Sequence, residues 1–306
     1  MMGWKIVLSF IFFILVIMLL VFYWILPIGE LIEFGVSSPG HANFTLNASL
    51  GQGMQFYENM RYQSPNISYR IDSCPLARED EMTRAFDFLE INTILNFYEV
   101  NSREEISITC EDSVRGERGL FIAGEGGVTN VTVTENFNVI FNGMVLLLRE
   151  SKCPYPIVGT HELLHALGFD HSDNPNNIMY PTINCKQTIG DDLINYINWL
   201  YSFPILPDLS FEDTSASMKG RYLSFVITIR NHGLKNSENS TVIIYADNKS
   251  IKEFEVEPIT IGSGRIITLS NIFVMQRNIK ELELFIEYNF EELNKDNNRI
   301  TLEIKE

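Results

Sequence analysis

Three of the five histidines in this 306-residue chain lie within the segment H-E-L-L-H-A-L-G-F-D-H at 161–171. His161 and His165 are four residues apart, so on a helix both imidazoles project from one face and can share one metal ion. Gly168 can adopt the positive φ that ends a helix, and the resulting turn would bring His171 back as a third ligand. Three imidazole nitrogens leave one position of a tetrahedral zinc ion open, which is typical of a catalytic site.

Glu162 directly follows the first of these histidines, where its carboxylate can reach a water molecule on the metal. Zinc acidifies such a water and polarises a carbonyl group, so we expect Glu162 to accept the water's proton as a general base. The alternative is that these are ordinary surface or core residues. Five fixed positions at about 5% each arise by chance on the order of once in a million starting positions, which favours the zinc site.

The segment resembles the metzincins, a group of zinc peptidases, and among them the matrixins (matrix metalloproteinases). His171-Ser172 matches the H-S of the matrixins, and N-I-M-Y-P at 177–181 matches their Met-turn, with Met179 eight residues beyond the third histidine. Looser similarity to the family's first strand, first helix, second strand and last helix extends the resemblance over residues 60–203.

The resemblance implies an α+β domain in which a twisted mixed sheet lies beside the active-site helix. It implies hydrolysis of peptide bonds with one catalytic zinc ion on His161, His165 and His171, and Met179 at the base of the site. It also implies that a strand at 137–148 aligns an extended polypeptide substrate by edge pairing. An ordinary sheet strand fits that stretch equally well.

Two departures from the matrixin pattern restrict these implications. No cysteine precedes Cys74, so the propeptide cysteine that occupies the zinc in matrixins has no counterpart in this sequence. The sequence G-E-G-G at 124–127 stands where the family has a segment rich in His and Asp that binds a structural zinc. We therefore expect no second zinc ion, and structural calcium stays open.

Four cysteines, Cys74, Cys110, Cys153 and Cys185, allow three disulfide pairings. We favour Cys74–Cys110 and Cys153–Cys185, because the second bond would join the two ends of the segment that contains the motif helix and the Met-turn. Four free thiols are the alternative, which an extracytoplasmic location disfavours. The spacing C-x-x-C does not occur, so a cysteine zinc site has little support.

The N-terminal run at 6–28 contains no charged side chain, and about 20 apolar residues suffice to cross a bilayer. We expect an uncleaved transmembrane signal anchor at 1–28, because the run is longer than a secretory signal and no small-residue cleavage site follows it. Lys5 would remain inside, which places the rest of the chain outside a cell membrane that is crossed once. Secretion after cleavage of this segment is the alternative. Six sequons agree with an external location, at Asn43, Asn47, Asn66, Asn130, Asn239 and Asn248.

Residues 29–59 are rich in Gly, Ser, Asn and Pro without a sustained period, which predicts an extracellular stalk. In the domain at 60–203, apolar residues at i, i+3, i+4 and i+7 predict a helix at 78–92, and a last helix is expected at 191–201. Its strands are expected at 67–71, 95–100, 106–110, 119–123 and 137–148.

Beyond Pro207 the chain alternates between apolar and polar residues in short stretches separated by turn residues. These stretches are 222–229, 241–245, 252–256, 265–272, 281–288 and 299–304. The pattern predicts an all-β, Ig-like sandwich at 207–306. Pro207-Asp208-Leu209 and the segments 227–233 and 291–298 resemble the CARDB domain, an Ig-like module of prokaryotic surface proteins. That resemblance implies a protein or a cell-surface component as the partner of this domain.

The formal net charge of −16 argues against a nucleic-acid partner, because phosphate binding needs a surplus of Lys and Arg. A content of 45% hydrophobic residues is enough for a sizeable core. We therefore predict a membrane-anchored, extracytoplasmic zinc endopeptidase that acts on polypeptides, with Glu162 as its general base. The alternative is a catalytically inactive surface adhesion or peptide-binding protein on a metzincin scaffold, and metal content together with cleavage distinguishes the two.

Overall fold

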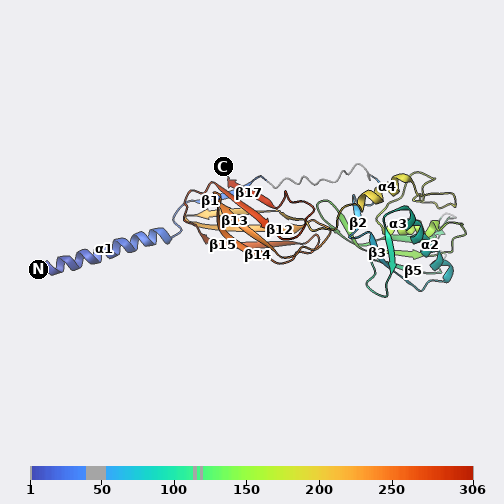
Figure 1. Ribbon diagram of the computed structural model, residues 1–306, viewed down its shortest axis with the longest axis horizontal. Helices are drawn as coiled ribbons and strands as arrows, with labels where there is room; N and C mark the ends of the chain where they lie inside the picture. The colour runs from blue at the N-terminus through green and yellow to red at the C-terminus, as the bar shows by residue number, and fades with distance from the viewer. Residues whose placement is uncertain (1, 39–52, 113–115, 118–119, 306) are drawn as a thin grey trace.

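The computed structural model describes residues 2–38, 53–112, 116–117 and 120–305 of the chain. Three parts follow one another along its long axis (Figure 1): helix α1 (Met2–Ile25), a large β-sheet unit, and a smaller α+β unit. Helix α1 and the α+β unit lie at opposite ends, so the β-sheet unit separates them. Within α1, residues Ile6–Trp24 are long and apolar enough, by length and composition, to cross a membrane.

The α+β unit is built on a sheet of six strands among the described residues, in the order β2-β9-β5-β3-β4, with β8 on the other side of β9. All its neighbouring strands run parallel except β8, which is antiparallel to β9. The strands are β2 (Met60–Tyr62), β3 (Asn66–Asp72), β4 (Asn96–Glu99), β5 (Ile106–Cys110), β8 (Gly124–Val133) and β9 (Asn138–Leu147). A short hairpin of β6 (Gly116–Glu117) and β7 (Leu120–Phe121) precedes β8.

Strand β8 is an edge strand, whereas β9 lies inside the sheet. β9 pairs with β5 and β2 along one side and with β8 along the other, so neither side is open to a substrate. The expectation that the strand at 137–148 offers an open edge is therefore wrong, and β8 is the edge strand beside it. The sequence does not predict β8, because its first residues, G-E-G-G at 124–127, have low β propensity and no alternation.

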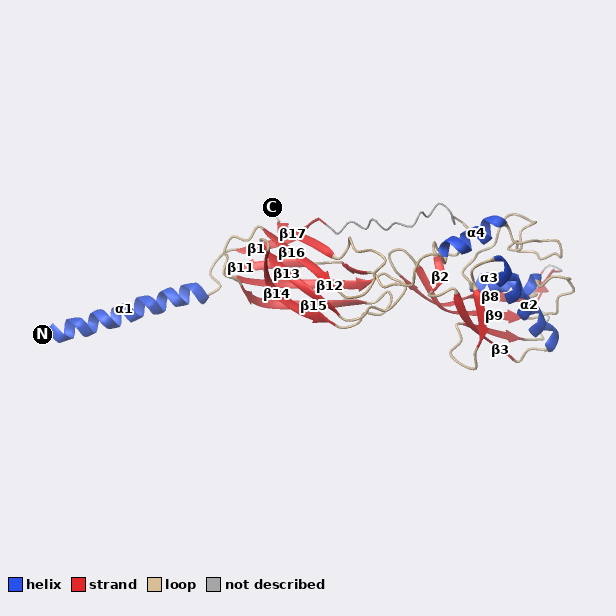
Figure 2. Cartoon of the chain, viewed as in Figure 1, coloured by secondary structure: helices blue, strands red, loops and turns tan. Residues whose placement is uncertain are grey.

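Three helices accompany this sheet, and Figure 2 shows them all within the α+β unit. They are α2 (Leu76–Asn92), α3 (Ile157–Ala166) and α4 (Asp191–Leu200). The apolar period that predicts α2 is confirmed, because the residues that it places on one face are buried: Met82, Ala85, Phe86 and Leu89. Helix α3 is buried along its whole length. Gly159 lets it approach α2 closely, since an added Cβ would lie 3.2 Å from the Cβ of Ala85.

The β-sheet unit contains nine strands of the described chain, which form one continuous hydrogen-bonded sheet over a common apolar core. The strands expected between 222 and 304 are all present, whereas β1, β10 and β11 are not predicted from the sequence. The nine are β1 (Leu31–Ser38), β10 (Leu209–Phe211), β11 (Ser215–Lys219), β12 (Tyr222–Asn231), β13 (Ser240–Ala246), β14 (Lys249–Val256), β15 (Gly264–Phe273), β16 (Glu281–Glu287) and β17 (Arg299–Ile304).

Strand β1 precedes the α+β unit in the chain and yet lies inside the C-terminal sheet. Residues 31–34 pair with β11, and residues 34–38 pair with β17. β1 thereby joins the half of the sheet that contains β10, β11, β12 and β15 to the half that contains β13, β14, β16 and β17. Phe34 is 0% exposed and belongs to the core of this unit.

The predicted stalk at 29–59 is therefore wrong wherever the structure describes it. Residues 31–38 are a strand of the C-terminal sheet, and Gln55 and Asn59 are buried in the α+β unit. Residues 39–52, which include the sequons at Asn43 and Asn47, lie outside the described residues. The local pattern does not predict β1, because its hydrogen-bond partners, β11 and β17, lie in the last third of the chain.

The two folded units contact each other directly. The backbone N–H of Glu135, in the turn between β8 and β9, donates a hydrogen bond to Nδ1 of His232 at 3.0 Å. Leu234 and Ile261 of the β-sheet unit belong to the apolar core of the α+β unit. Gly262 packs against Thr132 of β8 so closely that an added Cβ would lie 2.1 Å from its methyl group. The end of β8 is therefore fixed by the neighbouring unit.

We expect Phe34→Ala to lower the free energy of unfolding of the β-sheet unit by about 3–5 kcal/mol, the usual effect of removing a buried phenylalanine. Val36→Ala on the same strand is the matched control, because Val36 is 43% exposed and such surface changes stay within about 0.5 kcal/mol. Chemical denaturation of a soluble fragment that begins at Glu30 measures both. Equal stability of the two variants would show that β1 is not part of the core.

Candidate metal centre

Helix α3 carries two of the three histidines, and a carboxylate from α2 caps its first turn. Pro156 at the N-cap position makes no side-chain hydrogen bond, so the first N–H groups of α3 need another acceptor. Oε1 of Glu81 accepts the N–H of Gly159 at 3.2 Å. Burial raises the pKa of the Glu81 carboxyl group. A carboxylate at a helix N-terminus is favourable, so Glu81 fixes the start of the helix that carries the site.

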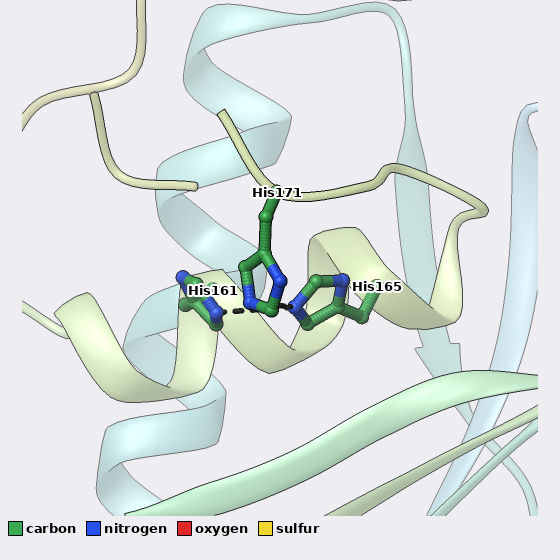
Figure 3. Close-up of side chains that lie close together, drawn as sticks. All are labelled: His161, His165 and His171. Carbon is green, nitrogen blue, oxygen red and sulfur yellow. Dashed lines mark hydrogen bonds between the residues drawn. The ribbon is translucent and has the colours of Figure 1, made fainter. Parts of the chain in front are cut away.

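The three imidazoles converge on one point (Figure 3). Nε2 of His165 lies 3.1 Å from Nε2 of His161 and 3.2 Å from Nε2 of His171. His161 and His165 extend from α3, and His171 reaches them from the loop that follows the helix. Gly168 permits this return with a φ of 92°, in the left-handed region that favours glycine. Among the described residues, only this group of His, Cys, Asp or Glu side chains brings three ligand atoms within 4.8 Å of one another.

Backbone carbonyl groups orient two of the rings. Nδ1 of His161 lies 2.6 Å from the oxygen of Ile178, and Nδ1 of His165 lies 2.8 Å from the oxygen of Phe169. Because a carbonyl oxygen only accepts, each Nδ1 carries the proton and each Nε2 presents a lone pair. Burial lowers the pKa of His161 to about 4 and also lowers the pKa of His165. Both imidazoles are thus neutral, the form that binds a metal ion.

The spacing of the nitrogens fits zinc. Since the Nε2 atoms of His161 and His165 both present lone pairs, the contact between them repels unless a cation lies between the rings. Tetrahedral Zn–N bonds of about 2.0–2.1 Å place ligand nitrogens about 3.3–3.4 Å apart. The distances of 3.1 and 3.2 Å are close to that value. Three nitrogens, with no fourth candidate ligand among the described residues, form the donor set of an open site.

Glu162 of helix α3 packs against the glycines at the start of β8. An added Cβ at Gly124 would lie 2.7 Å from Cγ of Glu162, and one at Gly126 would lie 2.1 Å from its backbone oxygen. Burial raises the pKa of the Glu162 carboxyl group to about 8, although the Gly126 N–H donates a hydrogen bond to it. The sequence shows these glycines only as a departure from the matrixin pattern; in the structure they make room for the proposed general base.

The Met-turn contacts the histidine segment through its backbone. Met179 is buried, and its carbonyl oxygen accepts the N–H of Ser172, the residue after the third histidine. The preceding residue, Ile178, is the one whose carbonyl orients His161. The backbone of the turn therefore helps to position His161 and the segment that carries His171. The side chain of Met179 takes no part in these two contacts.

Two disulfides join the segments around the site. Cys74, which follows β3, is bonded to Cys110 at the end of β5, and Cys153, which precedes α3, is bonded to Cys185 in the loop after the Met-turn. These are the pairs that the sequence favours. Because Cys74 is in a disulfide, it is not available as a zinc-binding cysteine in this state.

A cavity of about 400 Å³ lies beside the first histidine. Ile157 and Thr160 of α3 line one wall, one turn before and next to His161, and Ile178 lines another. Residues 185–189 close the opposite side, so the loop after the Met-turn determines the depth of the cavity. A second cavity, of about 450 Å³, lies between Phe56, Tyr57 and the middle of β8, and Phe56 stacks on His165.

Comparison with known proteins divides the chain into two parts. The model of the matrixin family matches residues 61–202, and the model of the CARDB family matches residues 206–302. A macrophage metalloelastase from Oryctolagus cuniculus is 32% identical over 162 residues, which cover 45% of this chain and 33% of the metalloelastase. The chain thus spans about a third of the length of that relative.

One solved structure is also similar to part of this chain. The crystal structure of a CARDB domain from Pyrococcus furiosus, in complex with di-metal ions, is similar with a TM-score of 0.28 and 17% identity. The match covers 32% of this chain and 87% of that structure.

We expect Gly126→Ala to lower the free energy of unfolding by about 1–3 kcal/mol, as overpacking does, because its Cβ would meet the backbone of Glu162. Gly127→Ala is the matched control, since nothing lies within 4 Å of a Cβ at that position. Thermal unfolding of the two variants measures the difference. If Gly126→Ala were as stable as Gly127→Ala, β8 would not lie against α3 as described.

Proposed function

We propose, from the premise that this chain carries a matrixin-like domain followed by a CARDB domain, that it is a zinc-dependent endopeptidase anchored in a membrane by α1. One observation supports the catalytic part above all others. The Nε2 atoms of three imidazoles converge, with contacts of 3.1 and 3.2 Å, and Glu162 is buried on the helix that carries two of the three histidines. Ordinary packing does not require this combination.

The reaction is hydrolysis of a peptide bond, and zinc held by His161, His165 and His171 would supply Lewis-acid polarisation and an acidified water. Glu162 accepts the proton of that water and transfers it to the leaving amine. Burial raises the pKa of this carboxyl group, and the positive charge of a bound zinc ion would lower it again, which favours the carboxylate form that a general base requires. The Gly126 N–H keeps the carboxyl group directed toward the site.

Strand β8 is the element that we assign to substrate binding. Among the described strands it pairs only with β9, so its outer edge is open to an extended peptide except at the Gly126 N–H, which donates to Glu162. Its first residues lie against Glu162. A peptide that pairs with this edge therefore runs past the zinc ligands with its scissile bond near the general base.

The cavity beside His161 is the pocket that we assign to a substrate side chain. Apolar residues of α3 and the Met-turn line it, and its volume of about 400 Å³ exceeds that of any single side chain. A long apolar residue next to the scissile bond would bury its surface there, at roughly 25 cal/mol per Å². The proposed specificity is accordingly for large apolar residues rather than for small or charged ones.

Helix α1 supplies the proposed anchor, and two contacts join its end to the β-sheet unit. The guanidinium group of Arg221 lies 3.7 Å from the ring centroid of Trp24, and Arg277 donates a hydrogen bond to the hydroxyl group of Tyr23 at 3.1 Å. Trp and Tyr favour the membrane interface. An extracytoplasmic location fits the exposure of the described sequon asparagines, which are Asn66, Asn130, Asn239 and Asn248.

The test of this function compares the parent fragment from Glu30 onward with Glu162→Ala and Glu150→Ala. We expect one zinc ion per chain in all three by elemental analysis. Cleavage of an unfolded protein substrate should fall by about 10²–10⁴-fold in Glu162→Ala, the usual contribution of a general base. Glu150→Ala should cleave normally, because Glu150 is exposed and lies outside the site.

Zinc without cleavage in the parent would favour the peptide-binding alternative, and no zinc in any of the three would end the proposal. Undiminished cleavage by Glu162→Ala would remove the role of Glu162 alone.

We further expect peptides with leucine or a longer apolar residue at the scissile bond to be cleaved at least about tenfold faster than peptides with alanine, since each buried methylene is worth about 1–3 kcal/mol and leucine has three more side-chain carbons than alanine. Ile189→Trp, which would fill the cavity, should reverse that preference. Ile183→Trp, on the same loop but outside the lining, should not. The measurement is kcat/KM for a peptide series, and equal preference in the parent and Ile189→Trp would refute the assignment.

A further inference from the structure

A second cluster of buried polar side chains lies where the chain enters the β-sheet unit. Asp208, just before β10, is 1% exposed, and Glu292, in the segment between β16 and β17, is nearly as buried. Asn297 and Asn298 lie beside them, and Asn298 is 0% exposed. None of these residues belongs to the histidine site. Burial of two carboxyl groups in one cluster is unfavourable unless something compensates for the charge.

The hydrogen bonds of the cluster leave two amide oxygens without a partner. The Nδ2 group of Asn297 donates to Oδ1 of Asp208 at 2.8 Å, and the Nδ2 group of Asn298 donates to Oε2 of Glu292 at 2.6 Å. These contacts fix the orientation of both amides, because the reverse orientation would face oxygen with carboxylate oxygen. The Oδ1 atoms of Asn297 and Asn298 are buried and accept no hydrogen bond from any described residue.

Among the described residues, no Lys or Arg side chain compensates for the charge of the two carboxylates. No ion pair among the described residues involves Asp208 or Glu292. His232 is near Asp208, but its Nδ1 accepts the Glu135 N–H, and its Nε2 faces Glu212 at 3.2 Å. Burial raises the pKa of Asp208, and it raises the pKa of Glu292 to about 7.

We propose that this cluster binds one divalent cation of the calcium type, with the carboxylate of Asp208 and Oδ1 of Asn297 as ligands and with Glu292 and Asn298 beside them. Every available donor is oxygen, from carboxylate or amide groups, which is the ligand set that calcium prefers and zinc does not. A double positive charge would balance the two carboxylates, and the ion would satisfy a buried amide oxygen that has no hydrogen-bond donor.

The cluster lies next to the junction between the β-sheet unit and the α+β unit. The backbone N–H of Asp208 donates to Oδ1 of Asn231, and its carbonyl oxygen accepts the N–H of His232. His232 in turn accepts the N–H of Glu135 from the α+β unit. An ion on Asp208 would therefore stabilise the junction between the two units, next to the end of β8.

The experiment uses the full chain in detergent with its zinc site saturated, equilibrated against calcium chloride and analysed for bound calcium. We expect about one calcium ion per chain, with a Kd in the range of about 10⁻⁴–10⁻³ M or tighter, as in extracellular calcium modules. Asp208→Asn should weaken binding about tenfold or more. Asp213→Asn, the same change at a nearby exposed position, should leave binding unchanged.

A second variant separates loss of a ligand from loss of folding. Asn297→Asp adds a carboxylate at the unpartnered oxygen, so it should bind calcium more tightly than the parent and show a larger rise in Tm on addition of calcium. The parent chain failing to bind calcium at millimolar concentration would overturn the proposal. So would unchanged binding by Asp208→Asn, or by Asn297→Asp.

Discussion

The α+β unit is organised around one electrostatic constraint: three imidazoles converge, and two of them, His161 and His165, direct the lone pairs of their Nε2 atoms toward each other at about hydrogen-bond distance. That arrangement is unfavourable without a cation, so the surrounding chain has to impose it. The carbonyl groups of Ile178 and Phe169 hold two rings, and the left-handed conformation of Gly168 returns the third. The cap from Glu81 and the two disulfides fix the segments from which these groups extend.

Local spacing explains what the sequence reveals about this arrangement. The three site histidines, Glu162 and Met179 are within nineteen residues of one another. Helix geometry relates the spacing of His161, Glu162 and His165 directly to their directions. Strand pairing, in contrast, depends on residues far apart in the sequence. β8 is the edge strand because of which strands flank β9, and Gly126 fits against Glu162 because two distant elements approach each other. Neither is encoded in a period that a single segment displays.

The same limit applies to the β-sheet unit. Its six strands after residue 221 follow from alternation, but β1 looks like a linker because its hydrogen-bond partners come from β11 and β17, far along the chain. Matches to the two family models, at 61–202 and 206–302, likewise exclude it. The pairing of β1 with β11 and β17 can form only after the α+β unit between them has been synthesised. Strand pairing between such distant segments is a slow step in folding.

The position of β1 also determines what proteolysis can release. The peptide between Ser38 and Gly53 is the covalent path from α1 into the α+β unit, and if α1 is the proposed anchor, a cut there would ordinarily release the part of the chain that follows. Here the two fragments would stay together, because β1 would remain paired with β11 and β17 and Phe34 would remain in the core. The nicked molecule would be an assembly of two chains that separates only when the β-sheet unit unfolds. To separate both folded units from α1 in one step, a protease would have to cut before Leu31, next to the proposed anchor.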